Sequence, residues 1–235
     1  MTESRRQRLR ALLAVDHDAV SGSVLARLCV LTRSELAVSG AGVSLIDRPG
    51  GPNRLQRLAQ ASDPIGARLE DLQLTVGEGP GVDAVTSGAA VLVPNLTVAA
   101  PRWPAYAPGA LAAGVSAVFA FPLALGSIRL GSLDCYRTTA GELTGLQVGS
   151  GLTLAELAFE AVISEIAEHA HDDLGWISDI HAEVHQASGI VMYEHGVSIH
   201  AALLRIRGYA YANSLPITEV ARRIVERDLL LEEEE

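Results

Sequence analysis

The chain has 235 residues, a hydrophobic content of 49% and a formal net charge of −10, which suits a globular protein with one average domain and a smaller unit. All 18 basic residues are arginine, and the lack of lysine excludes a P-loop, a kinase phosphate-anchoring lysine and a Schiff-base lysine. Two cysteines cannot build a disulfide framework and no apolar run is long enough to predict a membrane span, so we expect a cytoplasmic protein.

Residues 1–38 carry apolar side chains at helical spacing and predict one or two helices. Residues 39–138 mix short strands and helices. AGVSLID (41–47) and NRLQRLAQAS (53–62) predict a hairpin across a Pro/Gly turn, and VSAVFAFPLAL (115–125) with LGSLDCYRT (130–138) predicts a central hairpin that turns at Gly126. Between the hairpins, Asp63 followed by a proline predicts the start of a helix.

Residues 39–138 contain little that indicates a catalytic motif. GEGPGVD (77–83) is rich in glycine but follows a helical pattern and has no nucleotide-binding fingerprint, so we interpret it as a turn at a helix start. Cys135 lies on the apolar side of its strand and predicts a core thiol. Trp103 either lines a pocket or caps the core, with packing as the default. We therefore expect no enzyme and no catalytic residues.

Residues 142–231 are predicted to be helical throughout. Two heptad seams occur there, separated by a four-residue stutter, and they favour a dimeric coiled coil; the alternative is an amphipathic helix that packs on its own domain. The seams are Leu152, Ala155, Phe159, Val162 and Ile166, then Ile177, Ile180, Val184, Ala187 and Val191.

The end of the chain predicts a three-helix bundle of about fifty residues. Gly196 suits a helix C-terminus, Ser198 suits an N-cap and Pro216 opens the last helix. On the second helix, Ile199, Ala202, Leu203, Ile206 and Ala210 share one face, and we expect Arg205, Arg207, Tyr209 and Tyr211 to lie away from it.

These segments resemble two known families. The middle zone is similar to the GAF sensor domains of actinobacterial regulators in ASDPIGARLEDLQLTVGEGPGVDAVTSG, VLVPNL, RWPAYAPGA and GVSAVFAFPLALGSIRLGSLDCYR. The C-terminal zone resembles the ANTAR module of transcription antiterminators. The residues that carry this second resemblance are Gln186, Ala187, Gly189, Met192, Ala202, Arg207, Ala210, Val220 and Ala221.

The resemblance implies an α+β fold in which a GAF-like antiparallel sheet with flanking helices is followed by a long helix and a three-helix ANTAR module. The expected divisions are a helical segment at 1–38, the GAF-like domain at 39–138, a connector or coiled coil at 139–180, the ANTAR module at 181–231 and an acidic tail at 232–235.

The function implied is that of a homodimeric antitermination regulator whose modules bind tandem hexaloop hairpins in mRNA leaders. Loop recognition combines base stacking with phosphate pairing, so Arg207 is the first candidate for an RNA contact. The other candidates are Arg205, Tyr209, Tyr211, Gln186, Ser188 and Gly189. No cofactor is expected, although the GAF pocket leaves room for a small ligand that the sequence does not name.

Two departures from the family patterns matter. Ser188 stands where a basic residue is usual, and residues 181–230 balance five arginines against five acids, so a second hypothesis is a homodimeric ligand-sensing or protein-interaction module that has lost RNA affinity. Gly81 stands where many GAF relatives carry cysteine, which excludes cysteine chemistry there.

His181 and His185 lie at i and i+4 on one predicted helix face. Without a third ligand at a suitable spacing, a solvated helix face is the better interpretation than a metal site. A pH response of this helix is a further hypothesis, because histidine titrates near neutrality.

Overall fold

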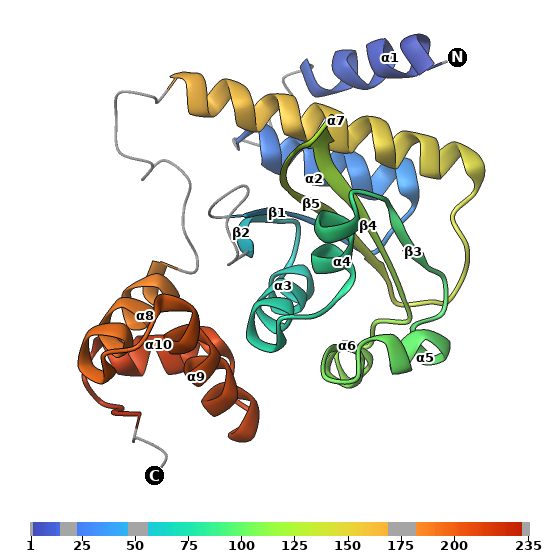
Figure 1. Ribbon diagram of the computed structural model, residues 1–235. Helices are drawn as coiled ribbons and strands as arrows, with labels where there is room; N and C mark the ends of the chain where they lie inside the picture. The colour runs from blue at the N-terminus through green and yellow to red at the C-terminus, as the bar shows by residue number, and fades with distance from the viewer. Residues whose placement is uncertain (1, 15–22, 47–55, 169–181, 232–235) are drawn as a thin grey trace.

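The computed structural model describes residues 2–14, 23–46, 56–168 and 182–231 and shows a five-stranded sheet covered on both faces by helices, followed by a small helical module (Figure 1). The strands are β1 (Gly40–Ile46), β2 (Gln56–Ala61), β3 (Val91–Val93), β4 (Ala117–Leu125) and β5 (Ile128–Arg137). Their order is β2-β1-β5-β4-β3, and all neighbours are antiparallel.

Both predicted hairpins are present. β1 pairs with β2, and β4 pairs with β5 through a tight turn at Gly126, whose φ of 60° favours glycine. Along β4 the side chains alternate between two cores. Phe119 and Phe121 lie in the core shared with two long helices, whereas Val118 and Ala120 lie in a second core on the opposite face.

One face of the sheet is covered by α2 (Val24–Leu36) and α7 (Gly145–Glu168), with α1 (Thr2–Ala14) packed outside them. The other face carries α3 (Pro64–Val76), α4 (Pro80–Ser87), the short α5 (Leu96–Ala99) and α6 (Tyr106–Ala112). The predicted cap of α3 is confirmed, because the Asp63 carboxylate accepts a hydrogen bond of 2.9 Å from the Gly66 amide. We call residues 2–168 the sheet domain.

The first heptad seam packs inside the sheet domain, as the alternative interpretation of this helix predicted. Ala155, Phe159 and Val162 are buried in the core that α7 shares with α2 and β4, and only Leu152 (44% exposed) and Ile166 (37%) reach the surface. By length and composition α7 is long and apolar enough to cross a membrane, but half of its most apolar stretch is buried inside the sheet domain.

The C-terminal module, residues 182–231, consists of α8 (Ala182–His195), α9 (Ile199–Ala212) and α10 (Ile217–Val225). The predicted boundaries are confirmed: Gly196 has a φ of 61°, the Ser198 hydroxyl accepts from the Ala201 amide at 3.2 Å, and Pro216 precedes α10. The second seam does not extend the first, because Val184, Ala187 and Val191 lie in the core of this module. Ile177 and Ile180 lie outside the described residues.

The C-terminal module docks on the sheet domain through α3, the nearest element of that domain in Figure 1. Leu74, near the end of α3, is buried in the apolar core of the module together with residues of α8, α9 and α10. One residue of the sheet domain therefore completes the core of the other unit.

Candidate functional site

Arg207 lies away from the apolar face of α9, as predicted, but its side chain is half-buried against the end of α3 and is not fully open to solvent. Its Nε donates a hydrogen bond of 2.7 Å to the carbonyl oxygen of Leu74. The guanidinium lies over Gly77, where an added Cβ would come within 3.1 Å of Arg207 Nη1. Burial lowers the pKa of Arg207 from its ordinary value, though the group stays charged. In this arrangement the first candidate for an RNA contact is occupied within the protein.

Ser188 was also predicted to contact RNA, but it lies inside the C-terminal module. Its side chain is fully buried in α8, and its hydroxyl donates to the Val184 carbonyl at 2.7 Å, so it cannot contact RNA in this conformation. Gln186, two residues earlier, is exposed, and Gly189 is half-buried. The structure thus separates the first-helix candidates into one core residue and two accessible ones.

An open groove of about 760 Å³ lies along α9, and it brings together two of the predicted contacts, Arg205 and Tyr209. Asn213 and the C-terminal segment 229–231 line the same groove, and Gly208 leaves its floor open because no atom lies within 4 Å of a Cβ added there. Tyr211 is 62% exposed but is not among the lining residues. Aromatic and guanidinium groups in one accessible groove are suited to stacking bases and pairing phosphates.

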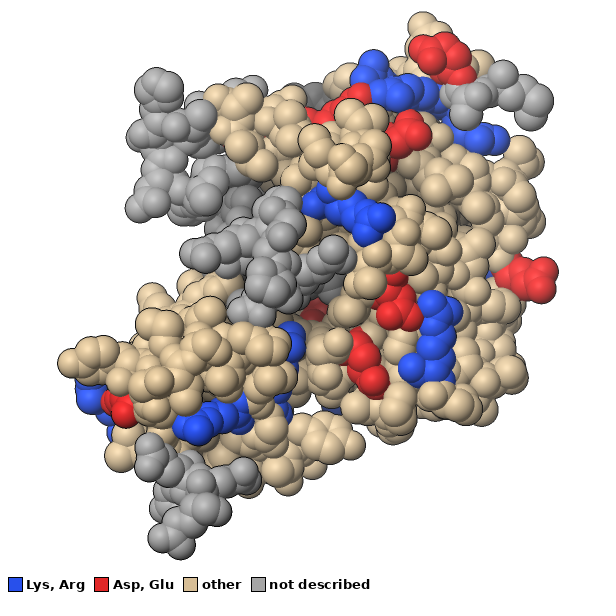
Figure 2. Space-filling model, viewed as in Figure 1, with Lys and Arg blue, Asp and Glu red and all other residues tan. Residues whose placement is uncertain are grey.

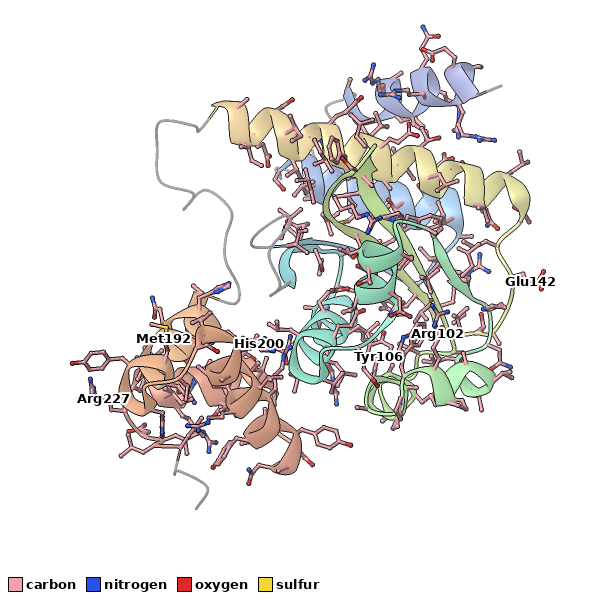
Figure 3. The ribbon with its side chains drawn as sticks, viewed as in Figure 1. Arg102, Tyr106, Glu142, Met192, His200 and Arg227 are labelled. Carbon is pink, nitrogen blue, oxygen red and sulfur yellow. The ribbon has the colours of Figure 1, made fainter. Side chains whose placement is uncertain are left out.

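The other arginines of the module are largely neutralised. Arg222 and Arg223 bind the Glu219 carboxylate, and Arg227 lies 3.8 Å from Glu194. Within the described part of the chain, Arg205 makes no hydrogen bond and no ion pair. Figure 2 shows the consequence on one face, where blue and red side chains are interspersed over the module without a continuous basic patch. Met192 and Arg227 lie on the side turned away from the sheet domain (Figure 3).

Of the predicted histidine pair, His181 lies outside the described residues. Within residues 2–14, 23–46, 56–168 and 182–231, no group of three or more His, Cys, Asp or Glu side chains could hold a metal ion. His185 is half-buried on α8.

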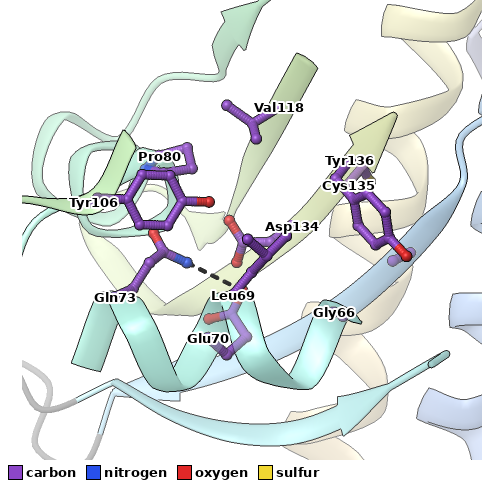
Figure 4. Close-up of a pocket in the computed structure, with 12 residues that line it drawn as sticks. Gly66, Leu69, Glu70, Gln73, Pro80, Tyr106, Val118, Asp134, Cys135 and Tyr136 are labelled. Carbon is purple, nitrogen blue, oxygen red and sulfur yellow. Dashed lines mark hydrogen bonds between the residues drawn. The ribbon is translucent and has the colours of Figure 1, made fainter. Parts of the chain in front are cut away.

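A buried polar cluster lies between the sheet and α3, beside a cavity of about 10 Å³ (Figure 4). Its centre is a pair of carboxyl groups, Glu70 on α3 and Asp134 on β5. Ser44 donates to Glu70 Oε2 at 2.5 Å, and Ser132 donates to Asp134 Oδ2 at 2.5 Å. Gln73 donates to Glu70 Oε1 at 3.1 Å. The cavity has room for about one water molecule.

The two carboxyl groups hold at least one proton between them. Burial and the nearby Asp134 charge raise the pKa of Glu70 well above its ordinary value, and burial raises the pKa of Asp134 to about 7. Asp134 Oδ1 is buried without a hydrogen-bond partner among the described residues. The Tyr106 hydroxyl also points toward this pair, and burial raises its pKa well above the ordinary value.

Gly81 lies directly over the carboxyl pair. A Cβ at this position would come within 2.7 Å of Asp134 Oδ1 and 2.8 Å of Ser132 Oγ, so no side chain fits without displacement. Its amide donates to Gln73 Oε1 at 2.8 Å. Gln73 therefore connects the carboxyl pair on one side to the start of α4 on the other.

The remaining candidates are structural. Cys135 and Cys29 are buried free thiols, and burial raises the pKa of Cys29 to about 12, so neither is a reactive thiol. Trp103 is buried in the second core, donates to Asp83 Oδ2 at 3.1 Å and does not line the cavity. The default interpretation of Trp103 as a packing residue is confirmed.

Comparison with known proteins separates the chain into the same two units. Residues 179–225 match the ANTAR domain family. The structure is similar to the GAF domain of a phosphoenolpyruvate-protein phosphotransferase from Acinetobacter (TM-score 0.52, 12% identity, 72% of this chain and 98% of that chain). The corresponding domain from Coxiella burnetii gives a TM-score of 0.51 at 14% identity, over 72% of this chain and 96% of that chain. At these identities the similarity shows the fold alone.

A third similar structure is a domain of a putative two-component sensor histidine kinase protein from Sinorhizobium meliloti (TM-score 0.52, 16% identity, 63% of this chain and 93% of that chain). No curated protein matches the chain.

Proposed function

We propose that this chain, in which a domain of GAF fold is joined to an ANTAR domain, is a cytoplasmic regulator that binds RNA hairpins in mRNA leaders and promotes transcription antitermination. It acts as a homodimer and not as an enzyme, with the sheet domain controlling the C-terminal module. The ANTAR match over residues 179–225 carries this proposal, because that family's modules are expected to bind RNA.

The accessible groove on α9 supports RNA binding at a specific place. Arg205 supplies a guanidinium with no partner within the described residues, and Tyr209 supplies an aromatic ring in the same groove. Guanidinium and aromatic groups recognise unpaired bases and phosphates, which is the chemistry that a hairpin loop presents. Tyr211, Gln186 and Gly189 do not line this groove and remain secondary candidates.

The test is a titration of the full chain with a labelled tandem hexaloop RNA at several salt concentrations. Arg205→Ala should weaken binding and reduce the slope of log K against log salt by about one, since one phosphate contact is lost. Tyr209→Ala should weaken binding with little change in that slope. Arg227→Ala is the matched control, because its side chain is 76% exposed and does not line the groove. Equal affinities for all three variants would contradict the proposed surface.

The sequestration of Arg207 and the balanced charge of the module favour a second candidate, a homodimeric sensing or protein-interaction module without RNA affinity. A folded dimer, established by sedimentation, that binds no RNA even at low salt would select this candidate.

A further inference from the structure

Helix α3 contacts both the sheet domain and the C-terminal module. On one side of its last turns, Glu70 and Gln73 form part of the buried polar cluster of the sheet domain. At its end, Leu74 and Thr75 contact the C-terminal module. Gln73 and Leu74 are adjacent in the chain, so a displacement of one moves the other.

The two units cap each other's helices at this contact. The last carbonyl groups of an α-helix have no partner within the helix, and Arg207 donates to one of them, the Leu74 carbonyl, at 2.7 Å. Conversely, the first amide groups of a helix lack internal acceptors, and the Thr75 hydroxyl oxygen accepts from the amide of Ile217, the first residue of α10, at 3.2 Å. The Leu74 side chain fills the module core between these bonds.

The contact leaves Arg207 with a weaker partner than RNA would offer. Within the described residues no carboxylate pairs with its guanidinium, and the acceptor of its Nε is a neutral carbonyl. Charge-assisted bonds from a guanidinium to a phosphate are roughly twice as strong as bonds between neutral groups and are often bidentate. A phosphate group and the end of α3 therefore compete for the same side chain.

We propose that the contact between α3 and the module is an autoinhibitory latch: while Leu74 and Thr75 are docked, Arg207 is withheld from RNA, and release of the end of α3 frees it. This rests on the proposed RNA-binding function. The polar cluster could control this contact through Gln73, which is the residue before Leu74. The Gln73 side chain donates a hydrogen bond to Glu70 and accepts one from the Gly81 amide. A change at the cluster that displaces Gln73 also displaces Leu74.

The test changes only the α3 side of the latch, which does not belong to the RNA-binding module. Leu74→Ala removes the side chain that fills the module core. Thr75→Val removes the acceptor of the Ile217 amide and serves as a second variant if the first fails to fold. Leu72→Ala is the matched control, because Leu72 lies on the same helix but packs on the core of the sheet domain. Each full-length variant is assayed for hydrogen exchange at the start of α10 and for affinity toward the tandem hexaloop RNA.

The latch predicts that Leu74→Ala and Thr75→Val accelerate hydrogen exchange at the Ile217 amide and tighten RNA binding. If roughly a tenth of the protein is open at rest, the affinity should rise about tenfold. Leu72→Ala should change neither the exchange rate nor the affinity. Faster exchange with unchanged or weaker RNA binding would overturn the latch and leave the proposed function intact. Unchanged exchange in both variants would overturn the docking itself. If no variant binds RNA despite faster exchange, the proposed function fails and the latch on RNA binding fails with it.

Discussion

The buried carboxyl pair makes the stability of the sheet domain depend on pH in a direction opposite to that of most paired aspartates. An aspartate in the unfolded chain has a pKa near 3.8, whereas burial raises the pKa of Asp134 to about 7. Between these values the folded protein binds more protons than the unfolded chain, so the free energy of unfolding falls as the pH rises. The contribution is fully present below pH 3.8 and is lost as the pH rises to about 7.

Asp134→Asn isolates this contribution. Asparagine retains an oxygen that accepts from Ser132, and its amide can donate toward Glu70, so it imitates the protonated state without titrating. From pH 5 to the folded-state pKa, at about 1.4 kcal/mol for each pKa unit, the wild type should lose on the order of 3 kcal/mol relative to the variant. Because the two carboxyl groups titrate together, the midpoint belongs to the pair.

Urea unfolding at intervals from pH 5 to pH 8 measures the difference between the two proteins. Asp228→Asn is the control, since Asp228 is exposed in the C-terminal module and its profile should remain parallel to that of the wild type. If the Asp134→Asn profile also runs parallel to the wild type, Asp134 does not change its protonation between pH 5 and pH 8 in the folded protein, and the raised pKa assigned to it is wrong.

Four further substitutions test the packing and the cap of α3. Gly81→Ala should lower the free energy of unfolding by about 1–3 kcal/mol in urea denaturation, because its Cβ would lie 2.7 Å from Asp134 Oδ1; a neutral result would mean that α4 shifts freely. Phe159→Ala should lower the free energy of unfolding by about 3–5 kcal/mol at any protein concentration, whereas Ile166→Ala should lower it by less than about 1 kcal/mol. A loss that depends on protein concentration would instead indicate that α7 forms a coiled coil between two chains. Asp63→Ala should lower the free energy of unfolding by about 1–2 kcal/mol, because α3 loses its N-cap, and thermal denaturation measures the change. An unchanged Tm would show that water replaces the capping carboxylate.

Local structure could be predicted from the sequence because its signals are local. The cap at Asp63, the turn at Gly126 and the boundary at Gly196 each depend on a few neighbouring residues, and all three were predicted correctly. Hydrophobic periodicity also predicted the two hairpins and the three C-terminal helices.

The position of Arg207 could not be predicted in the same way. Helical periodicity shows which side chains leave the core of their own unit, but it cannot distinguish solvent from the surface of a second domain. The heptad seam of α7 was ambiguous for a related reason, since Ala155 and Phe159 satisfy the same spacing whether they pack on β4 or on another chain.

The carboxyl pair was missed although a signal was present. Glu70 lies on the same helical face as the apolar Leu69 and Leu74, and Asp134 interrupts a buried strand between Leu133 and Cys135. Two acidic residues at buried positions of neighbouring elements indicate a shared polar site. The sequence alone could not show that these positions face each other across the domain.

The insertion of Leu74 into the core of the C-terminal module has a practical consequence for how this protein is divided in the laboratory. A fragment that begins at the ANTAR boundary would lack Leu74, a core residue that lies about a hundred positions upstream. The space that the Leu74 side chain fills would be open to solvent, and Arg207 would lose its acceptor, the Leu74 carbonyl. Such a fragment is a poor reference for the resting protein. An RNA affinity measured on it includes any contribution from Arg207, which the intact chain holds against the end of α3.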